Sequence, residues 1–370
     1  MAVYTVTYLG NNYGSVLQAL ALQKTIRSHG TDAYVLIKKN TAEVKASFAD
    51  RVINFLRPRK NYTLIRRLKL RMQGKKYAQK NQKIRRFVRE HLSVLYVDST
   101  KEAVDRLQPG DVLLAGSDQI WNMMDAPVPD WYTFRWEGIP EGVRKYSYAA
   151  SIGLSELSEE QKNQYSMILR DIETVSLRER QAAILLQPLL KQPVRCDLDP
   201  TLLCDEQFWL NYTGERKETE PYIFVYMLRP DKALMRAAGE LGRETGKKVF
   251  YTGKMADRFC GVETVYDMGI EDFLAYVKYA DCVITNSFHG TVFSVLFHKQ
   301  FLSKKIASTS SRTENLLTML DLMDRYVEEH EGLRGIDDPI DYDNVDKKLA
   351  AEREKSLKYI REICRECGSE

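Results

Sequence analysis

Several features that would assign a protein to a special class are missing from this sequence of 370 residues. No apolar run approaches the roughly 18 residues that a membrane-spanning helix needs. The first ten residues contain neither a basic leader nor a long apolar segment, so they do not resemble a secretory signal. We therefore expect a cytoplasmic protein.

Cysteine is also scarce and poorly arranged for metal binding. The six cysteines are scattered, and Cys364 and Cys367 form the only CxxC pair, with no second pair and no histidine pair. A zinc or redox site normally needs more ligands at regular spacing. The sequence thus favours reduced thiols and predicts no metal site and no cofactor.

Acidic residues are absent from one long stretch. Residues 51–89 contain fifteen Lys or Arg and no Asp or Glu, whereas the whole chain has a net charge of only +4. A solvated helix face would explain such a run, and the alternative is an anionic partner such as a phosphate-linked glycan or the inner membrane surface. No aromatic residues are interleaved in the manner of a nucleic-acid site, so we expect no nucleic acid.

The remaining composition is that of a globular chain with room for two cores, at 44% hydrophobic residues. Short apolar runs alternate with helical patterns in both halves, which is typical of α/β folds with parallel sheets. We predict two Rossmann-like doubly wound domains over 1–214 and 221–340, with a basic helical insertion at about 51–91. A last helix within 341–370 is expected to brace the first domain.

The stretch from Ala280 to Phe301 contains the most chemically distinctive turn. Its pattern predicts a buried strand over 281–285 and a helix over 291–298, with Asn-Ser-Phe-His-Gly (286–290) as the turn between them. Such a turn lies at the carboxyl edge of the sheet, where helix N–H groups attract anions. His289 is either a structural histidine or a functional one, and its place beside Gly290 favours function.

The residues around this turn indicate the kind of ligand. No acidic residue occurs between Asp281 and Glu314, whereas Lys304 and Arg312 lie among several basic residues. This suggests a phosphate or carboxylate ligand. The carboxylate that would bind the ribose of a nucleotide is not visible after the turn.

Three further loops follow predicted strands in the first half. The turn at 10–14 contains Asn12, Tyr13 and Gly14, and is either a ligand site or only a well-made turn. The loop at 116–122 groups side chains that commonly bind sugars, namely Asp118, Gln119 and Asn122 for the hydroxyls and Trp121 for the ring face. Arg178 follows a third strand, where it would either bind an anion or pair with Glu179.

Together these segments resemble the polysaccharide pyruvyl transferase family. The matching segments are Asn-Asn-Tyr-Gly-Ser-Val-Leu-Gln (11–18), Gly-Ser-Asp-Gln-Ile-Trp-Asn (116–122), Tyr-Ala-Ala-Ser-Ile-Gly (148–153), Ser-Leu-Arg-Glu (176–179), Asp-Pro-Thr-Leu-Leu (199–203) and Ser-Phe-His-Gly-Thr (287–291). The resemblance implies a fold similar to the GT-B glycosyltransferases, with the site in the cleft between the domains. It also implies phosphoenolpyruvate as donor, and as acceptor a sugar hydroxyl pair of a glycan or lipid-linked glycan, giving a pyruvyl ketal.

Under this interpretation Arg178 holds the donor and His289 is the general acid and base. Candidate substrate contacts are Asn12, Tyr13, Gly14, Ser117, Asp118, Asn122, Ser287, Gly290, Thr291, Lys304 and Arg312. Two alternatives stay open, namely a GT-B glycosyltransferase that uses a nucleotide sugar and a non-catalytic glycan-binding relative.

Overall fold

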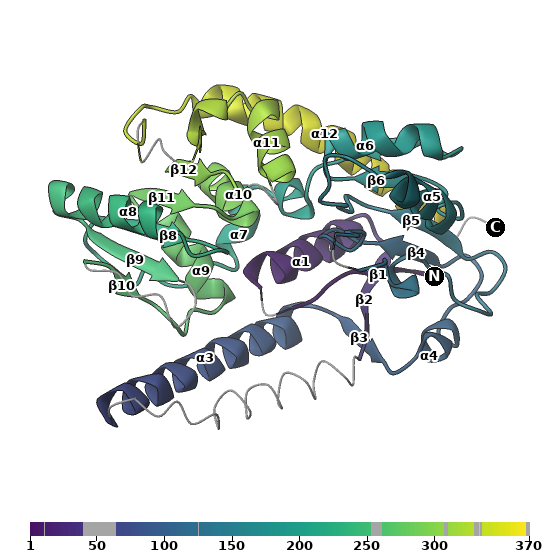
Figure 1. Cartoon of the computed structure of the whole chain (residues 1–370). Coiled ribbons are helices and arrows are strands. Elements are labelled where there is room, and N and C mark those ends of the chain that lie inside the picture. Colours follow the sequence, from purple (N-terminus) through teal and green to yellow (C-terminus); the bar gives the residue numbers. More distant parts are fainter. Residues whose placement is uncertain are drawn as a thin grey trace.

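A computed structural model describes residues 1–10, 12–39, 64–124, 126–252, 261–306, 310–328, 333 and 335–367, except for the side chains of 64–73 and 310. It contains two α/β domains that lie side by side (Figure 1). Each domain is built around one parallel sheet, as the alternating pattern of the sequence predicts.

The first sheet has the spatial order β3-β2-β1-β4-β5. Its strands are β1 (Ala2–Val6), β2 (Asp32–Lys38), β3 (Val94–Val97), β4 (Val112–Ala115) and β5 (Arg144–Ser147). All pairs are parallel, and Val3 lies opposite both Ala33 and Val112. A short parallel pair, β6 (Val175–Leu177) and β7 (Val194–Cys196), follows beyond β5 through isolated bridges.

The second sheet repeats this order and adds one strand, as β10-β9-β8-β11-β12-β13. Its strands are β8 (Tyr222–Tyr226), β9 (Lys248–Thr252), β10 (Glu263–Thr264), β11 (Cys282–Thr285), β12 (Gln300–Lys304) and β13 (Tyr326–Val327). In both sheets the strand order reverses at one point, between β1 and β4 and between β8 and β11. Doubly wound sheets bind ligands at the carboxyl ends of the strands that flank this point.

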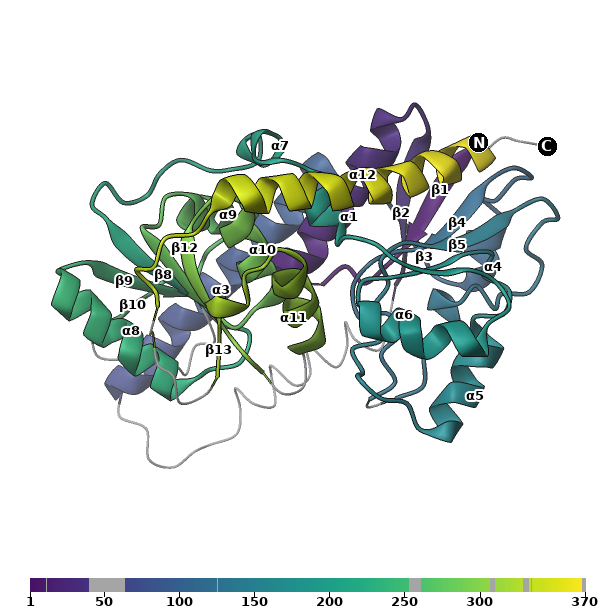
Figure 2. The same ribbon diagram turned by 90° about the horizontal axis from the view of Figure 1, so that it is seen from above.

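Helices cover both faces of the sheets (Figures 1 and 2). They are α1 (Tyr13–Ser28), α3 (Leu64–His91), α4 (Thr100–Val104), α5 (Glu159–Ile168), α6 (Arg180–Leu186), α7 (Glu206–Leu210), α8 (Lys232–Thr245), α9 (Ile270–Lys278), α10 (Phe288–Leu296), α11 (Ser310–Met319) and α12 (Tyr342–Glu366). The central strands β4 and β11 are buried at every residue, which explains why each appears in the sequence as a continuous apolar run.

An apolar core joins the two domains. Helix α1 of the first domain packs against α9 and α10 of the second, and Tyr13 stacks on Phe273 with ring centroids 4.7 Å apart. Trp209 meets Phe293 edge to face at 5.0 Å. Because a large apolar interface resists sliding, these contacts fix the sheet edges of the two domains relative to each other.

Two long helices also connect the domains. The first half of α12 packs on the second domain through Val345 and Leu349, and its second half on the first sheet through Tyr359 and Ile360 (Figures 1 and 2). The Tyr359 hydroxyl donates to the Ser147 carbonyl at 3.0 Å.

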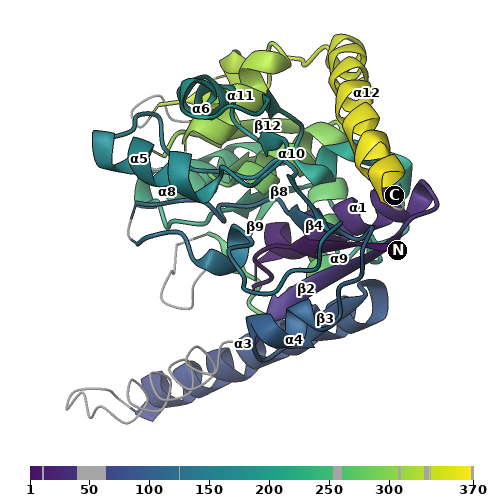
Figure 3. The same cartoon turned by 90° about the vertical axis from the view of Figure 1, so that its right-hand side faces the viewer.

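Helix α3 lies along the opposite side of the molecule (Figure 3). It contains part of the basic stretch, of which residues 51–63 fall outside the described residues. Lys83 pairs with Asp272 and Arg86 with Glu271, each at 2.8 Å, so this helix of the first domain is attached to α9 of the second. Lys80 lies over the Tyr13 ring at 4.2 Å, and burial lowers the pKa of its amine to about 8.

Some boundaries differ from the sequence-based predictions. Helix α5 ends at Ile168, although its polar pattern suggests continuation to Glu173. Helix α12 begins at Tyr342, within the range expected for the last helix, because Asp341 caps its first turn by accepting from the Asn344 N–H. Among the described helices, none is both long and apolar enough to cross a bilayer.

Candidate functional site

The histidine turn is shorter than the sequence suggests. Helix α10 begins at Phe288, three residues before the predicted start at Thr291. Ser287 is its N-cap residue and accepts from the Gly290 N–H at 3.4 Å. His289 therefore belongs to the first turn of a helix at the strand-order reversal of the second sheet. The positive end of the helix dipole favours an anion at this position.

A chain of charged contacts connects His289 to the first domain. Arg178 follows β6 and donates from Nη2 to the Asp199 carboxylate, with Nη2 and Oδ2 3.0 Å apart. His289 Nε2 lies 3.7 Å from the same Oδ2 atom. All three side chains are buried, so water screens their interactions little. The expected alternative of an Arg178–Glu179 ion pair is not what forms; the partner is Asp199.

Asp199 is held in its ionised form. Burial acts against the charge, but Arg178 and His289 outweigh it and hold the pKa of the Asp199 carboxyl well below its usual range. Its second oxygen, Oδ1, accepts from the Thr201 hydroxyl and from the Thr201 N–H at 2.9 Å. The carboxylate is thus fixed in orientation and aligns the two groups that contact it.

A second arginine reaches the same place from the other domain. The guanidinium carbons of Arg178 and Arg312 lie 5.1 and 5.6 Å from the centroid of the Phe288 ring. Burial, followed by the like charge of Arg178, lowers the pKa of the Arg312 guanidinium. Two buried arginines gathered around one ring make a strongly positive region, which an anionic ligand would stabilise.

Several polar atoms in this region have no hydrogen-bond partner among the described residues. They are Arg178 Nε and Nη1, Arg312 Nε and His289 Nε2. Buried polar atoms are nearly always satisfied in folded proteins, so an unsatisfied group needs an explanation. Four of them together, mostly cationic donors, indicate a binding place for an acceptor-rich anion.

Helix α11 attaches Arg312 to the turn that contains Arg178. Asn315, one helical turn after Arg312, donates to the Arg178 carbonyl and accepts from the Arg180 N–H, both at 3.3 Å. The first residues of α6 lack a side-chain cap of their own, and Asn315 supplies one from the other domain. The site therefore depends on both domains.

Two glycines in the candidate list are required by close packing. A Cβ atom on Gly14 would lie 2.0 Å from His289 Nδ1, so the α1 turn of the first domain touches the imidazole directly. A Cβ on Gly290 would lie 2.2 Å from the Thr285 hydroxyl. Gly290 thus lets α10 approach β11, whereas the sequence analysis placed it among the candidate substrate contacts.

Other candidates near the turns have structural partners. Asn12 caps α1 by accepting from the Gly14 N–H at 3.2 Å, and Tyr13 donates to the Met268 carbonyl at 3.1 Å. Thr291 donates to the Ser303 hydroxyl at 2.9 Å inside the second domain. Ser117 contacts both Arg178 and Asp199, so it belongs to the charged chain.

The remaining candidates are less tightly grouped. Asp118 lies in the loop after β4 with a φ of 81°, an unusual value for a residue other than glycine, and its charge acts on Arg312. Asn122 accepts from the Met124 N–H at 2.7 Å. Lys304 is buried, and its ammonium pairs with Asp231, which does not belong to the chain of charged contacts around Arg178.

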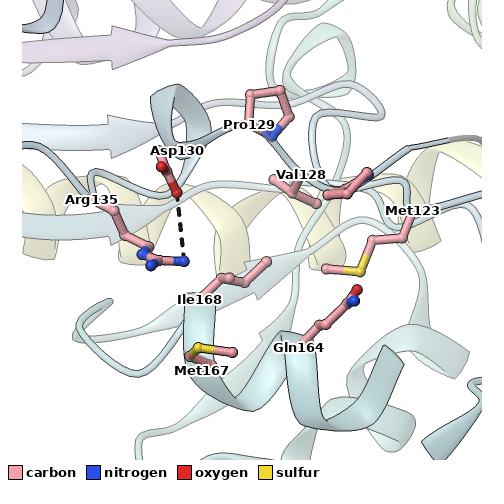
Figure 4. Close-up of a pocket in the computed structure, with 9 residues that line it drawn as sticks. Met123, Val128, Pro129, Asp130, Arg135, Gln164, Met167 and Ile168 are labelled. Carbon is pink, nitrogen blue, oxygen red and sulfur yellow. Dashed lines mark ion pairs between the residues drawn. The ribbon is translucent and has the colours of Figure 1, made fainter. Parts of the chain in front are cut away.

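A separate pocket opens beyond Asn122 (Figure 4). It lies between the loop that follows this residue and α5. Asp130 and Arg135 form an ion pair at its side, drawn in Figure 4, with their charged atoms 3.5 Å apart. Its lining residues are Met123, Pro127, Val128, Pro129, Asp130, Arg135, Gln164, Met167 and Ile168, none of which is a predicted site residue. In the described part of the chain, no group of three or more His, Cys, Asp or Glu side chains is placed to hold a metal.

Sequence reasoning gave no role to three residues that the structure brings to the site, namely Asp199, Phe288 and Asn315, and it considered Glu179 only as a possible partner of Arg178. The Asp-Pro-Thr segment carries the resemblance but contains no chemistry that singles out Asp199 as the link between Arg178 and His289. Asn315 lies on a helix with no distinctive motif. Only its contact with the Arg178 turn shows its function as a cap.

A family model described as polysaccharide pyruvyl transferase matches residues 12–304. The chain belongs to this family. The match includes the turns that contain Gly14, Ser117, Arg178, Asp199 and His289, and confirms the resemblance. A search of curated protein sequences gives no significant match.

Solved structures confirm the fold. UGT89C1 of Arabidopsis thaliana, solved with UDP-L-rhamnose, has a TM-score of 0.54 at 11% identity, covering 98% of this chain and 99% of its own. A UDP-N-acetylglucosamine 2-epimerase has a TM-score of 0.52 at 11% identity, covering 97% and 94%. MnaA of S. aureus, solved with UDP, gives 0.50 at 13% identity, covering 100% and 93%. At these identities the likeness shows the fold alone, which is the GT-B arrangement of two Rossmann-like domains.

Proposed function

We propose that this member of the family transfers a pyruvyl group from phosphoenolpyruvate to two hydroxyls of a sugar, forming a cyclic ketal on a polysaccharide or its precursor. The observation that carries the proposal is the meeting of Arg178, Arg312 and His289 in one buried place, with unsatisfied donor atoms on both arginines. Phosphoenolpyruvate is a compact anion with a carboxylate and a phosphate. Two guanidinium groups suit these two groups by charge and shape.

Charge balance supports a multiply charged donor. The two arginines contribute two positive charges, and Asp199 is the negative charge that directly contacts Arg178. The helix dipole of α10 adds further positive potential at His289. Burial has removed water from these cations. The oxygens of the bound donor would take the place of that water as hydrogen-bond acceptors.

The chemistry requires movement of protons as well as anion binding. One sugar hydroxyl adds to C2 of the enol phosphate while C3 gains a proton and becomes a methyl group. The second hydroxyl then displaces phosphate from C2, which closes the ketal ring. His289, in contact with the fixed Asp199 carboxylate, is the proposed group that accepts a hydroxyl proton and returns it to the leaving phosphate.

The proposed acceptor is a glycan or lipid-linked glycan that approaches from the loop after β4. Asp118 and Asn122 offer oxygen acceptors there, and the charge of Asp118 acts on Arg312. The exposed residues of α3 include Lys75, Lys76, Arg85 and Arg89. We propose that they attract an anionic acceptor or the membrane surface that carries one.

The test combines purified protein, phosphoenolpyruvate and a set of p-nitrophenyl hexosides with different free hydroxyl pairs. Pyruvyl transfer predicts phosphate release that depends on both substrates, and a product with the added mass of a pyruvyl ketal. UDP-hexoses serve as the competing donors, and their binding is measured by calorimetry. Tight UDP-hexose binding without phosphoenolpyruvate binding would overturn the proposal in favour of a glycosyltransferase.

A further inference from the structure

Glu179 is a buried carboxyl group beside the charged chain that the proposed mechanism leaves without a role. It is 2% exposed and follows Arg178 at the start of α6. It does not pair with Arg178, which is bound to Asp199. A buried acid without a cationic partner is costly, so its presence in the candidate site requires an explanation.

The two oxygens of Glu179 have different surroundings. Oε1 accepts a hydrogen bond from the hydroxyl of Ser151, which lies in the loop after β5. Oε2 is buried and has no hydrogen-bond partner among the described residues. The side chain is thus held by one oxygen, and the other is available for a proton or a substrate.

The groups around Glu179 come from several elements. Besides Ser151, they are Arg178 on the preceding turn, Arg312 on α11, Tyr165 on α5 and Cys196 on β7. Burial raises the pKa of Glu179, and Ser151, Arg312 and Arg178 offset this only in part. In the same site the pKa of Asp199 is lowered. Two carboxyl groups with pKa values pushed in opposite directions are typical of separate roles as a proton donor and as an ionised partner.

We propose that Glu179 is the acid that protonates C3 of the enolpyruvyl group, an assignment that rests on the proposed function. In the first step, a sugar oxygen bonds to C2, the C2–C3 π electrons take the proton of Glu179, and His289 takes the hydroxyl proton. In the second step, the other sugar oxygen bonds to C2 and the C2–O bond to phosphate breaks. Glu179 regains a proton from that hydroxyl, and the phosphate leaves with its electron pair and the proton of His289.

This assignment solves a difficulty of the single-histidine scheme. Phosphoenolpyruvate needs a proton at C3 while a proton is being removed from the attacking oxygen, and these atoms lie on different parts of the reacting group. His289 and Glu179 belong to different domains and have different partners, since the imidazole contacts Asp199 and the Glu179 carboxyl is held by Ser151. One group can therefore donate while the other accepts.

The deciding variant is Glu179→Gln, which keeps the size of the side chain and an oxygen for Ser151 but has no acidic proton. We expect kcat to fall about 100-fold or more, with the KM for phosphoenolpyruvate changed less than about threefold. In the unmodified enzyme, kcat should fall as the pH rises through the pKa of Glu179, because only the neutral acid donates. The variant should lack this basic limb.

The matched control is Ser151→Ala, which retains the acid and removes its hydrogen bond. Since that bond lowers the pKa of Glu179, its loss should move the basic limb to higher pH, and kcat on the plateau should fall less than in Glu179→Gln because the acid is still present. A Glu179→Gln enzyme with normal kcat, or one that loses only donor affinity, would overturn the assignment and leave pyruvyl transfer intact. Unmodified protein that neither binds nor consumes phosphoenolpyruvate would overturn the proposed function and this assignment together.

Discussion

The two domains share a strand order but contribute different chemistry. The first domain supplies Arg178 and Asp199, an ion pair held by Ser117 and Thr201 on loops after β4, β6 and β7. The second supplies His289 on the first turn of α10 and Arg312 on α11. The charged pair and the imidazole meet only because α1, α3 and α12 fasten the domains together.

This difference shows how one architecture can divide a task. In the first domain, rigid loops at several strand ends provide fixed charge. In the second, a helix N-terminus provides an imidazole, which can accept and donate protons, and a dipole suited to an anion. Damage to either side should therefore give a distinct defect, loss of donor binding on the one hand and loss of turnover on the other.

The largest effect should follow from removal of the imidazole. We expect His289→Ala to lower kcat by a factor of about 10²–10⁴, the range typical for loss of a general acid or base. The fold should remain, because Ser287 still caps α10. Phosphate release and circular dichroism measure the two outcomes.

His298→Ala is the matched control for this variant. His298 lies just after the same helix but pairs with Asp346 at the surface, where it is 43% exposed. Its loss should leave turnover unchanged, since exposed ion pairs contribute only about 0–1 kcal/mol to stability. A folded His289→Ala enzyme with normal turnover would remove the imidazole from the mechanism.

The next effect concerns the first domain. Arg178→Lys keeps the positive charge but loses the planar fork, in which Nη2 contacts Ser117 and Asp199 while Nε and Nη1 stay available to a ligand. Loss of a charged hydrogen bond costs about 1.5–3 kcal/mol, so the Kd for phosphoenolpyruvate should rise roughly 10- to 150-fold. Calorimetry measures this, and Arg106→Lys in the exposed turn that follows α4 is the control. Unchanged donor affinity would make Arg178 a purely structural partner of Asp199.

The sequence predicted the strands and the doubly wound fold well because parallel strands leave continuous apolar runs, as at β4 and β11. It also singled out Arg178, Arg312 and His289, whose chemistry is visible in their residue types. The role of Asp199 and the capping by Asn315 were not predictable, because both depend on partners more than 20 residues away in the chain. The start of α10 was misjudged because His-Gly is a poor helix beginning in isolation, and the Ser287 cap decided otherwise.

A smaller effect should follow where the domains touch. In Gly14→Ala, the added methyl would occupy the position of the His289 ring, with Nδ1 only 2.0 Å away, so the imidazole must move. Because a displacement of about 1 Å can cost up to 10²-fold in rate, we expect kcat to fall roughly 10-fold or more while donor affinity changes little. Gly74→Ala on α3 is the control, since its Cβ would meet nothing within 4 Å. Equal losses in both variants would mean that the defect is unrelated to the imidazole.

The smallest effect should come from changes on the outer face of α3. The basic residues of this helix form two groups, one paired with acidic residues of α9 and one exposed to solvent. Lys83 and Arg86 hold α9, so reversing their charge would disturb the domain contact. Lys75, Lys76, Arg85 and Arg89 are exposed, and changing these four to Glu should leave donor affinity unaltered while it raises the KM for an anionic acceptor several-fold at about 0.05 M salt.

Salt distinguishes attraction at a distance from direct contact. Between about 0.05 and 0.5 M the Debye length falls from roughly 14 to 4 Å, so the unmodified and the charge-reversed enzyme should approach the same KM for the anionic acceptor. A neutral disaccharide acceptor should be indifferent to the four changes at every salt concentration. If the neutral acceptor suffers equally, then α3 shapes the site through its packing on α1 and α9, and its charge is incidental to acceptor capture.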